Sequence, residues 1–268
     1  ELYSEEIPPK LQISARNQLK SFVKKSFDEK SLKYKDIKIF SSPTRLILNI
    51  TDIPEKIKIL PKEIKGPKVD SPDIILESFI KSKNINKEDL FEKSTDKGNF
   101  YFIKTREKNI LVEDLLKEIL LKSLASISWK KSMKWSDYNL MWGRPLRSVF
   151  AIFNGKKINF EFDHLQTTDS IIIEQDLTIK SSKIKNFKDY NVFLKSNKII
   201  LDHNEREKII LNKIKKVSQS KDYKKAINPH LLEEVINIVE DPYILLINFN
   251  KEYLKIPKEI IISTLEKH

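Results

Sequence analysis

The sequence predicts an α+β fold in which mixed sheets pack against helices. Apolar residues recur at helical spacing over residues 11–27 and 112–127, and β-branched runs lie between them at 37–40 and 46–50. Strands and helices follow one another without the regular alternation of a doubly wound parallel sheet. At 268 residues the chain can form one large domain or two smaller ones. We expect one large α+β domain over the whole chain, with a possible seam near 180–188, where the globular signal is weakest.

Helix starts are marked by capping residues and by proline in the first turn. Pro8 and Pro9 precede the first helix, Asn86 and Asn109 can cap later ones, and Asn228 combines a cap with a following Pro229. On these signals and on apolar periodicity, helices are expected at 11–27, 72–83, 86–91, 112–127, 189–195, 204–217, 229–239 and from 257 onward.

Strands are predicted where β-branched and aromatic residues cluster between turn signals. Asn154-Gly155 is the strongest hairpin signal, and Asp96-Lys97-Gly98 marks a second turn. Residues 56–68 predict an edge strand followed by a loop at Gly66-Pro67. Further strands are expected at 37–40, 46–50, 100–105, 146–153, 157–162, 171–179, 199–201 and 243–249.

Composition excludes several classes of site. The chain has no Cys, which removes disulfides and thiolate ligands and is typical of a reducing cytoplasm. No two of its four Gly are closer than 12 positions, so no glycine-rich phosphate loop can form. Its four His lie far apart, and Asp163-His164 is more simply a turn at the end of a strand. We therefore expect no catalytic residues, no metal site, no membrane segment and a cytoplasmic location.

Charge favours a polyanionic partner. Fifty basic residues against 38 acidic ones give a net charge of +12. Because 44 of the basic residues are Lys and 6 are Arg, part of this excess matches the codon bias of an AT-rich genome. The same bias makes each Arg more informative, and Arg45, Arg144 and Arg147 are predicted to stand where a planar, bidentate fork is needed.

An aromatic and basic segment between Trp129 and Arg147 holds all three Trp and both Met. Bases stack on aromatic planes and phosphates attract cations, so the segment is a candidate RNA-binding surface. The alternatives are a corner whose Trp and Met fill a core, and lysines that only solvate a surface. The candidate RNA contacts are Lys130, Lys131, Lys134 and Trp135, with a second basic group that includes Lys215 and Lys216. We expect the first three lysines at the exposed C-terminal end of the preceding helix.

Seven motifs follow one another along the chain. They are E-E-I-P-P-K (5–10), S-P-T-R-L (42–46), K-G-P (65–67), T-D-K-G (95–98), K-S-M-K-W with R-P-L-R (131–135 and 144–147), L-L-E-E-V with V-E-D-P (231–235 and 239–242), and L-K-I-P-K-E (254–259). In this order they resemble the N-terminal part of the β subunit of bacterial glycyl-tRNA synthetase. Three positions depart from that pattern: S-I-I-I-E-Q at 170–175 replaces R-G-H-R-F, Ser136 replaces Gly, and Asp241 replaces an aromatic residue.

The resemblance implies a glycine–tRNA ligase of two α and two β subunits. The α subunit then holds the class II active site that uses ATP and Mg, and the β subunit mainly recognises tRNA-Gly. Residues 1–268 correspond to an N-terminal region similar to the B3/B4-like module of synthetase β subunits, with HD-like and anticodon-binding domains lying downstream of it. The expected role is a non-catalytic scaffold facing tRNA and the α subunit, with Arg45, Arg144 and Arg147 as structural or α-facing anchors.

Two alternatives remain open. The first is a hydrolytic editing-type module, which requires a polar pocket with a positioned water and is disfavoured by the missing R-G-H-R-F element. The second is a stand-alone RNA-binding adaptor. The chain opens in a strand-like segment and closes inside a helix, which favours part of a longer subunit over this second alternative.

Overall fold

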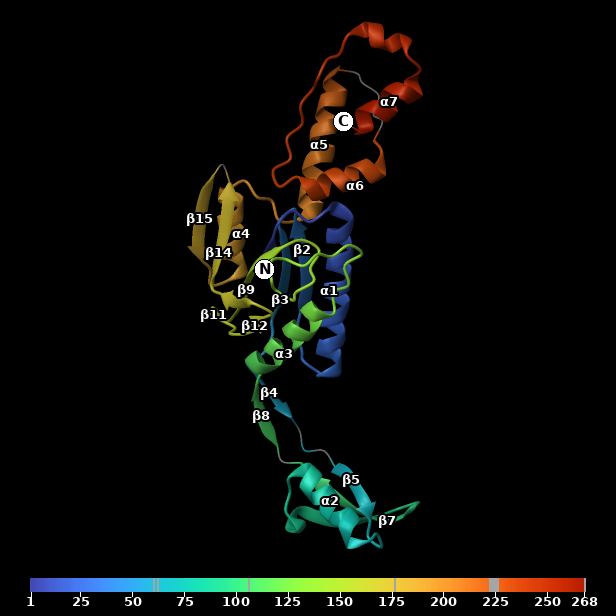
Figure 1. The fold of residues 1–268 in the computed structure, drawn as a ribbon, viewed down its shortest axis with the longest axis vertical. Coiled ribbons are helices and arrows are strands. Elements are labelled where there is room, and N and C mark those ends of the chain that lie inside the picture. The colour runs from blue at the N-terminus through green and yellow to red at the C-terminus, as the bar shows by residue number, and fades with distance from the viewer. Residues whose placement is uncertain (60, 62, 106, 176, 222–226, 268) are drawn as a thin grey trace. The chain divides into compact units, whose positions relative to one another are not determined.

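The computed structural model describes all residues except 60, 62, 106, 176, 222–226 and 268. The chain forms two compact units (Figure 1). Unit 1 comprises Glu1–Ile53 and Leu116–His268, and unit 2 comprises Pro54–Leu115. Each unit combines helices with largely antiparallel strands, so the α+β prediction is confirmed. The division between units falls at 54 and 115, whereas the possible seam at 180–188 lies inside unit 1.

Unit 1 is built on a six-stranded sheet with the strand order β12-β13-β9-β1-β3-β2. All neighbours are antiparallel except β13 and β9, which run parallel. The first strand along the chain therefore lies in the middle of the sheet, between β3 and β9. The strand bounds are β1 Leu2–Ser4, β2 Asp36–Ser42, β3 Arg45–Thr51, β9 Leu146–Phe150, β12 Glu161–Phe162 and β13 Leu165–Thr168.

Helix α1 (Pro9–Glu29) packs along β2 through an apolar stripe of buried residues that includes Leu19, Val23 and Phe27. Helix α3 (Val112–Ala125) follows strand β8 (Lys108–Leu111) directly. Asn109 lies inside β8, opposite Lys58, so its expected role as a helix cap is wrong. The apolar periodicity located the helix, but pairing with another strand determined its start.

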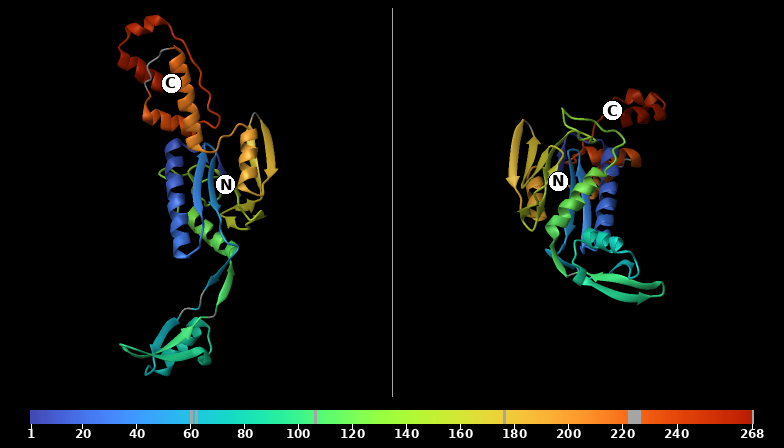
Figure 2. Two further views of the ribbon diagram at one scale, coloured as in Figure 1. Left: turned by 180° about the vertical axis from the view of Figure 1, so that it is seen from behind. Right: turned by 60° about the horizontal axis from the view of Figure 1, so that its bottom comes forward.

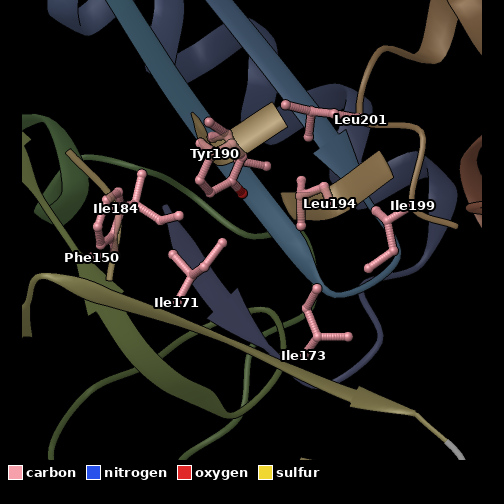
Figure 3. Packing of buried hydrophobic residues seen from close by; sticks show 9 residues of the cluster. Phe150, Ile171, Ile173, Ile184, Tyr190, Leu194, Ile199 and Leu201 are labelled. Atoms are coloured by element: carbon pink, nitrogen blue, oxygen red, sulfur yellow. The ribbon is translucent and has the colours of Figure 1, made fainter. Parts of the chain in front are cut away.

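A second layer of unit 1 covers the sheet with two hairpins and a helix (Figures 1 and 2). Asn154 and Gly155 both have positive φ, 48° and 74°, and they join β10 (Ile152–Phe153) to β11 (Lys156–Lys157), as the hairpin signal predicted. The second hairpin, β14 (Ser170–Gln175) with β15 (Thr178–Lys183), lies near helix α4 (Phe187–Ser196). Their shared core contains Ile171, Ile173, Ile184, Tyr190 and Leu194 (Figure 3).

The C-terminal part of unit 1 contains helix α5 (His203–Lys221), helix α6 (Pro229–Ile238), the short 3-10 helix η2 (Lys251–Lys255) and helix α7 (Lys258–Lys267). Asn228 caps α6 by accepting from the backbone amides of His230 and Leu231, as predicted. Residues 243–249 were expected to form a strand, but they are irregular and largely exposed. No strand in the part of the chain that the structure describes pairs with these residues, so their β-branched composition alone does not make them a strand.

Unit 2 contains a three-stranded antiparallel sheet, β5-β7-β6, and a separate pair, β4 with β8. Its elements are β4 Lys56–Ile59, β5 Glu63–Lys68, α2 Asp73–Lys83, the 3-10 helix η1 Lys87–Asp89, β6 Leu90–Thr95 and β7 Gly98–Lys104. The helix expected at 86–91 is only η1, which Asn86 caps, followed by β6. Gly66-Pro67 lies in a bulge of β5 rather than in a loop, because β7 pairs on both sides of it.

A buried arginine joins the C-terminal helices to the sheet. The Arg206 side chain is fully buried, and its guanidinium donates to the carbonyls of Ile236 (2.8 Å), Ile200 (2.6 Å), Leu201 (3.0 Å) and Ser41 (3.0 Å). Burial lowers the pKa of Arg206 to about 10, which leaves it charged at neutral pH.

We expect Arg206→Lys to lower the free energy of unfolding by about 2–4 kcal/mol, since an ammonium cannot reach acceptors on every side and leaves buried carbonyls unpaired. Urea unfolding measures the difference. Lys208→Arg on the same helix is the matched control, because Lys208 is exposed and the swap also keeps the charge. A variant as stable as this control would contradict the assigned role of Arg206.

Candidate functional site

The aromatic and basic segment forms a loop anchored at its base. Met133 and Trp142 form an isolated antiparallel bridge, with backbone N···O distances of 2.9 and 3.2 Å. Trp142 is buried, and the ring of Trp129 packs edge-on against it with centroids 4.9 Å apart. A Cβ on Gly143 would lie 2.4 Å from the Trp129 ring, so this close approach requires glycine. Trp142 therefore lies in a core with the half-buried Trp129 packed against it, whereas the alternative that placed the Met there is wrong, because both Met are exposed.

The tip of the loop is exposed. Lys130, Lys131 and Lys134 all face solvent, and half of the Trp135 surface is accessible. Met133 and Met141 add exposed apolar surface beside them. The structure thus combines the two interpretations: Trp129 and Trp142 hold the loop, while Trp135 and the lysines are presented outward.

The expected placement of these lysines on a helix end is wrong. Helix α3 ends at Ala125, and the lysines lie five or more residues beyond it in irregular chain. The helix dipole acts only within the last turn, so it does not account for their position. Lys134 lies inside the loop that the Met133–Trp142 bridge closes, and Lys130 and Lys131 lie between Trp129 and that bridge.

A stacked pair of rings holds the loop against the sheet. Tyr138 lies parallel to His164, with ring centroids 3.5 Å apart, and the His164 Nδ1 lies 2.8 Å from the Asp163 carboxylate. Asp163 and His164 form the tight turn between β12 and β13, where Asp163 has a φ of 55°. The Asp-His pair is therefore a turn at a strand end, as predicted, and serves as a support for the loop.

The second basic group lies on a different element. Lys215 and Lys216 are exposed on α5, distant in sequence from the loop. Lys213, on the same helix, donates to the Pro242 carbonyl at 2.8 Å and lies over the Tyr243 ring. The exposure of Lys215 and Lys216 is that expected of a solvated helix face, and their contact with RNA stays a prediction.

The three singled-out arginines have partners within the chain. Arg45 is buried, lies 3.2 Å from the Glu1 carboxylate and donates to the Ile172 carbonyl. Arg147 forms a bidentate pair with Glu174, whose second contact measures 2.7 Å, and so has the fork geometry expected of it. Arg144 donates through Nε to the Glu6 carbonyl at 3.0 Å, a single bond to the backbone rather than the bidentate fork predicted for it.

A polar pocket of about 280 Å³ collects residues from four of the segments compared above with family motifs. Its lining includes Glu6, Arg45, Glu174 and Glu240, together with Tyr3. Burial raises the pKa of the Tyr3 hydroxyl, so the phenol stays protonated at neutral pH. The lining holds no Ser, Cys or His, and its only hydroxyl groups are those of Tyr3 and Thr44.

A larger cavity of about 510 Å³ is mainly apolar. Its walls include Leu48 and Asn49 of β3 together with Ala151 and Ile152. These residues continue the lines of β3 and β9 past the positions that pair with β1.

Two further findings concern the described residues. They contain no group of three or more His, Asp or Glu side chains arranged to hold a metal ion. None of their helices combines the length and the apolar character that crossing a membrane requires.

Comparison with known proteins gives one consistent result. The sequence model described as "Glycyl-tRNA synthetase beta subunit" matches residues 1–268. The glycine–tRNA ligase beta subunit of Rickettsia canadensis (strain McKiel) is 35% identical over 273 residues, covering 100% of this chain and 40% of the relative. The corresponding proteins of Rickettsia peacockii (strain Rustic) and Rickettsia prowazekii (strain Madrid E) are 32% and 31% identical, with the same coverage of 100% and 40%.

We expect Gly143→Ala to disrupt the loop without unfolding unit 1. The new methyl group overlaps the Trp129 ring, so the ring must leave its place against Trp142. Near-UV circular dichroism should lose aromatic signal while far-UV dichroism is retained. Ser132→Ala, at an exposed position of the same loop, should change neither. An unchanged near-UV spectrum in Gly143→Ala would contradict the described packing.

Proposed function

The chain belongs to the family of glycyl-tRNA synthetase beta subunits, and we propose that it is a non-catalytic, tRNA-facing part of a glycine–tRNA ligase. It spans 40% of the length of the curated relatives that it matches. In this proposal the ligase works in the cytoplasm, and a separate α subunit, in an assembly of two α and two β subunits, activates glycine with ATP and Mg.

The exposed tip of the 130–141 loop supports a role toward tRNA-Gly. Lys130, Lys131 and Lys134 are exposed on irregular chain within five residues of the half-exposed Trp135. A lysine ammonium group binds a phosphate as a point charge, so it needs no fixed geometry. Lysines on a loop therefore suit the phosphate backbone and bind it independently of base sequence. A large exposed indole adds a surface on which an unpaired base can stack.

The arginines divide into two roles. Arg45 is buried among partners of its own chain, so we assign it a structural role. Arg147 and Arg144 are more accessible, and each fixes a different segment against the strand that begins at Leu146. We assign these two to a surface that positions the chain against the α subunit.

The replacement of R-G-H-R-F by S-I-I-I-E-Q supports the non-catalytic role over the editing alternative. The polar pocket has room for a small polar molecule, and its lining includes carboxylates, a phenol, the Thr44 hydroxyl and a buried guanidinium, but no His. Position 174, within the segment that replaces R-G-H-R-F, is a glutamate already paired with Arg147.

Replacing Lys130, Lys131 and Lys134 together by Gln should weaken tRNA binding and flatten its dependence on salt. Each lost phosphate contact is expected to reduce the slope of log K against log salt by about 0.7–0.9. Titrating tRNA-Gly against the chain at several salt concentrations measures the slope.

The matched control replaces Lys156, Lys157 and Lys188 by Gln, three exposed lysines on other elements. This variant changes the net charge equally, so a similar loss of slope in both would indicate a diffuse electrostatic effect. A slope unchanged by the loop substitutions would show that these lysines only solvate the surface.

The purified chain by itself should neither activate glycine nor hydrolyse charged tRNA. Pyrophosphate exchange with glycine and ATP tests the first activity, and release of glycine from glycyl-tRNA-Gly tests the second. Both rates should equal those of buffer without protein. A rate above that background in either assay, retained through a further purification step, would contradict the non-catalytic role.

A further inference from the structure

The three-stranded sheet of unit 2 carries an aromatic and basic surface on one face. Strand register places Phe102 of β7 opposite both Lys65 of β5 and Phe91 of β6. Phe100, two positions earlier on β7, lies opposite Lys93 and Lys68. Directly opposed residues point to the same side of a sheet, so all six side chains share one face. We call this set, Lys65, Lys68, Phe91, Lys93, Phe100 and Phe102, the Phe–Lys face.

Helix α2 packs on the other side of the sheet (Figure 2). A Cβ on Gly66 would lie 2.9 Å from the Phe79 ring of α2 and 3.0 Å from the Tyr101 carbonyl. Gly66 and Lys65 are adjacent in a strand, so their side-chain positions point to opposite sides. The Phe–Lys face is therefore the one that α2 does not cover, and the unit does not need aromatic residues there to pack its helix.

The bulge at Gly66-Pro67 gives this face its second lysine on β5. In a regular strand Lys65 and Lys68 would point to opposite sides, because three positions separate them. The register shift between them inserts an extra residue, which returns Lys68 to the side of Lys65. The proposed function gives no role to the K-G-P motif at 65–67. In unit 2 the motif allows close contact with α2 and places two lysines on the same side of the sheet.

The lysines stand over the aromatic rings. Lys65 Nζ lies 3.3 Å from the Phe100 ring centroid and Lys68 Nζ lies 5.8 Å from it, while Lys93 Nζ lies 5.6 Å from the centroid of Phe102. Phe91 is 37% exposed, and its ring stacks on that of Phe102 with the two centroids 6.1 Å apart. Phe102 is only 9% exposed, because the stem of Lys93 and the neighbouring ring cover it. Lysine side chains are long and flexible, so the ring faces beneath them are covered by groups that can move away.

We propose that the Phe–Lys face binds a single-stranded segment of RNA. Bases stack on the rings of Phe91 and Phe100, and the lysines that cover these rings in the free protein move outward to the phosphates on either side. With the exposed Lys104, this side of the sheet carries four lysines and one carboxylate, that of Glu63. The excess of positive charge favours a polyanion as the ligand. The proposal concerns unpaired bases and is independent of the 130–141 loop, whose lysines suit the phosphates of any RNA.

The test compares a single-stranded RNA oligonucleotide of about eight nucleotides, a length in the range of one stacking module, with a duplex of the same sequence. Phe91→Leu with Phe100→Leu keeps apolar volume but removes both stacking surfaces. We expect at least a tenfold weaker affinity for the single strand and little change for the duplex, since stacking contributes strongly for each base. Tyr101→Leu, an aromatic substitution on the α2 side of the same strand, is the matched control and should leave the affinity unchanged.

A second variant keeps the proposal testable if the double Phe variant is unstable. Lys65→Gln with Lys68→Gln changes only exposed side chains and should flatten the salt dependence of single-strand binding. Circular dichroism and thermal melting confirm that each variant is folded.

Three outcomes would overturn the proposal: no binding of the single strand by the unaltered chain at low salt, equal binding by the double Phe variant, or loss of single-strand binding only in the loop-lysine variant. Loss of α-subunit assembly in the double Phe variant, with RNA binding intact, would show a protein-docking face instead. A failure of the tRNA-Gly salt experiment would count against the loop without affecting these readouts.

Discussion

The guanidinium of Arg206 is the constraint on which the C-terminal half of unit 1 depends. It has no exposed surface and donates to carbonyls of β2, of residues 200 and 201, and of the last turn of α6. A charge placed there without partners would be strongly unfavourable, so the three segments must stay in place together. The neighbouring Arg16 repeats the arrangement by donating to Ser41 and, at 2.9 Å, to the side chain of Asn237. Helices α1, α5 and α6 are thus joined to one strand by polar contacts.

This constraint also explains why residues 199–201 are not a strand, although their composition predicted one. Ile199 and Leu201 are buried as the apolar pattern requires, but the carbonyls of Ile200 and Leu201 are satisfied by Arg206 and the amide of Ile200 by Glu240. A buried backbone needs hydrogen-bond partners, and it does not need them from a sheet. The strand propensity of residues 199–201 predicted their burial correctly but their secondary structure wrongly. Their carbonyls bond to the Arg206 side chain of the following helix instead of to a neighbouring strand.

Features that depend on neighbouring residues, such as turns and helix caps, could be predicted from the sequence. The Asn154-Gly155 hairpin and the Asn228 cap depend on residues next to one another and are present. The scarcity of arginine pointed to Arg45, Arg144 and Arg147, of which Arg147 has the bidentate pairing predicted. The same argument applied to every arginine would have included Arg206. The Phe–Lys face left no such signal, because its members come from three strands and become neighbours only through register and a bulge.

The central position of β1 in the sheet has a consequence for the order in which the chain can acquire structure. One edge of β1 pairs with β3, about forty residues later in the sequence. The other edge pairs with β9, where Val149 lies opposite Leu2. During synthesis, β1 therefore keeps one unpaired edge until β9 (Leu146–Phe150) has been made. Unit 2 is a contiguous stretch of mostly local contacts, and it is complete by residue 115. Because local contacts form faster than distant ones, the inserted unit is expected to fold first, and the sheet that precedes it in sequence closes afterwards.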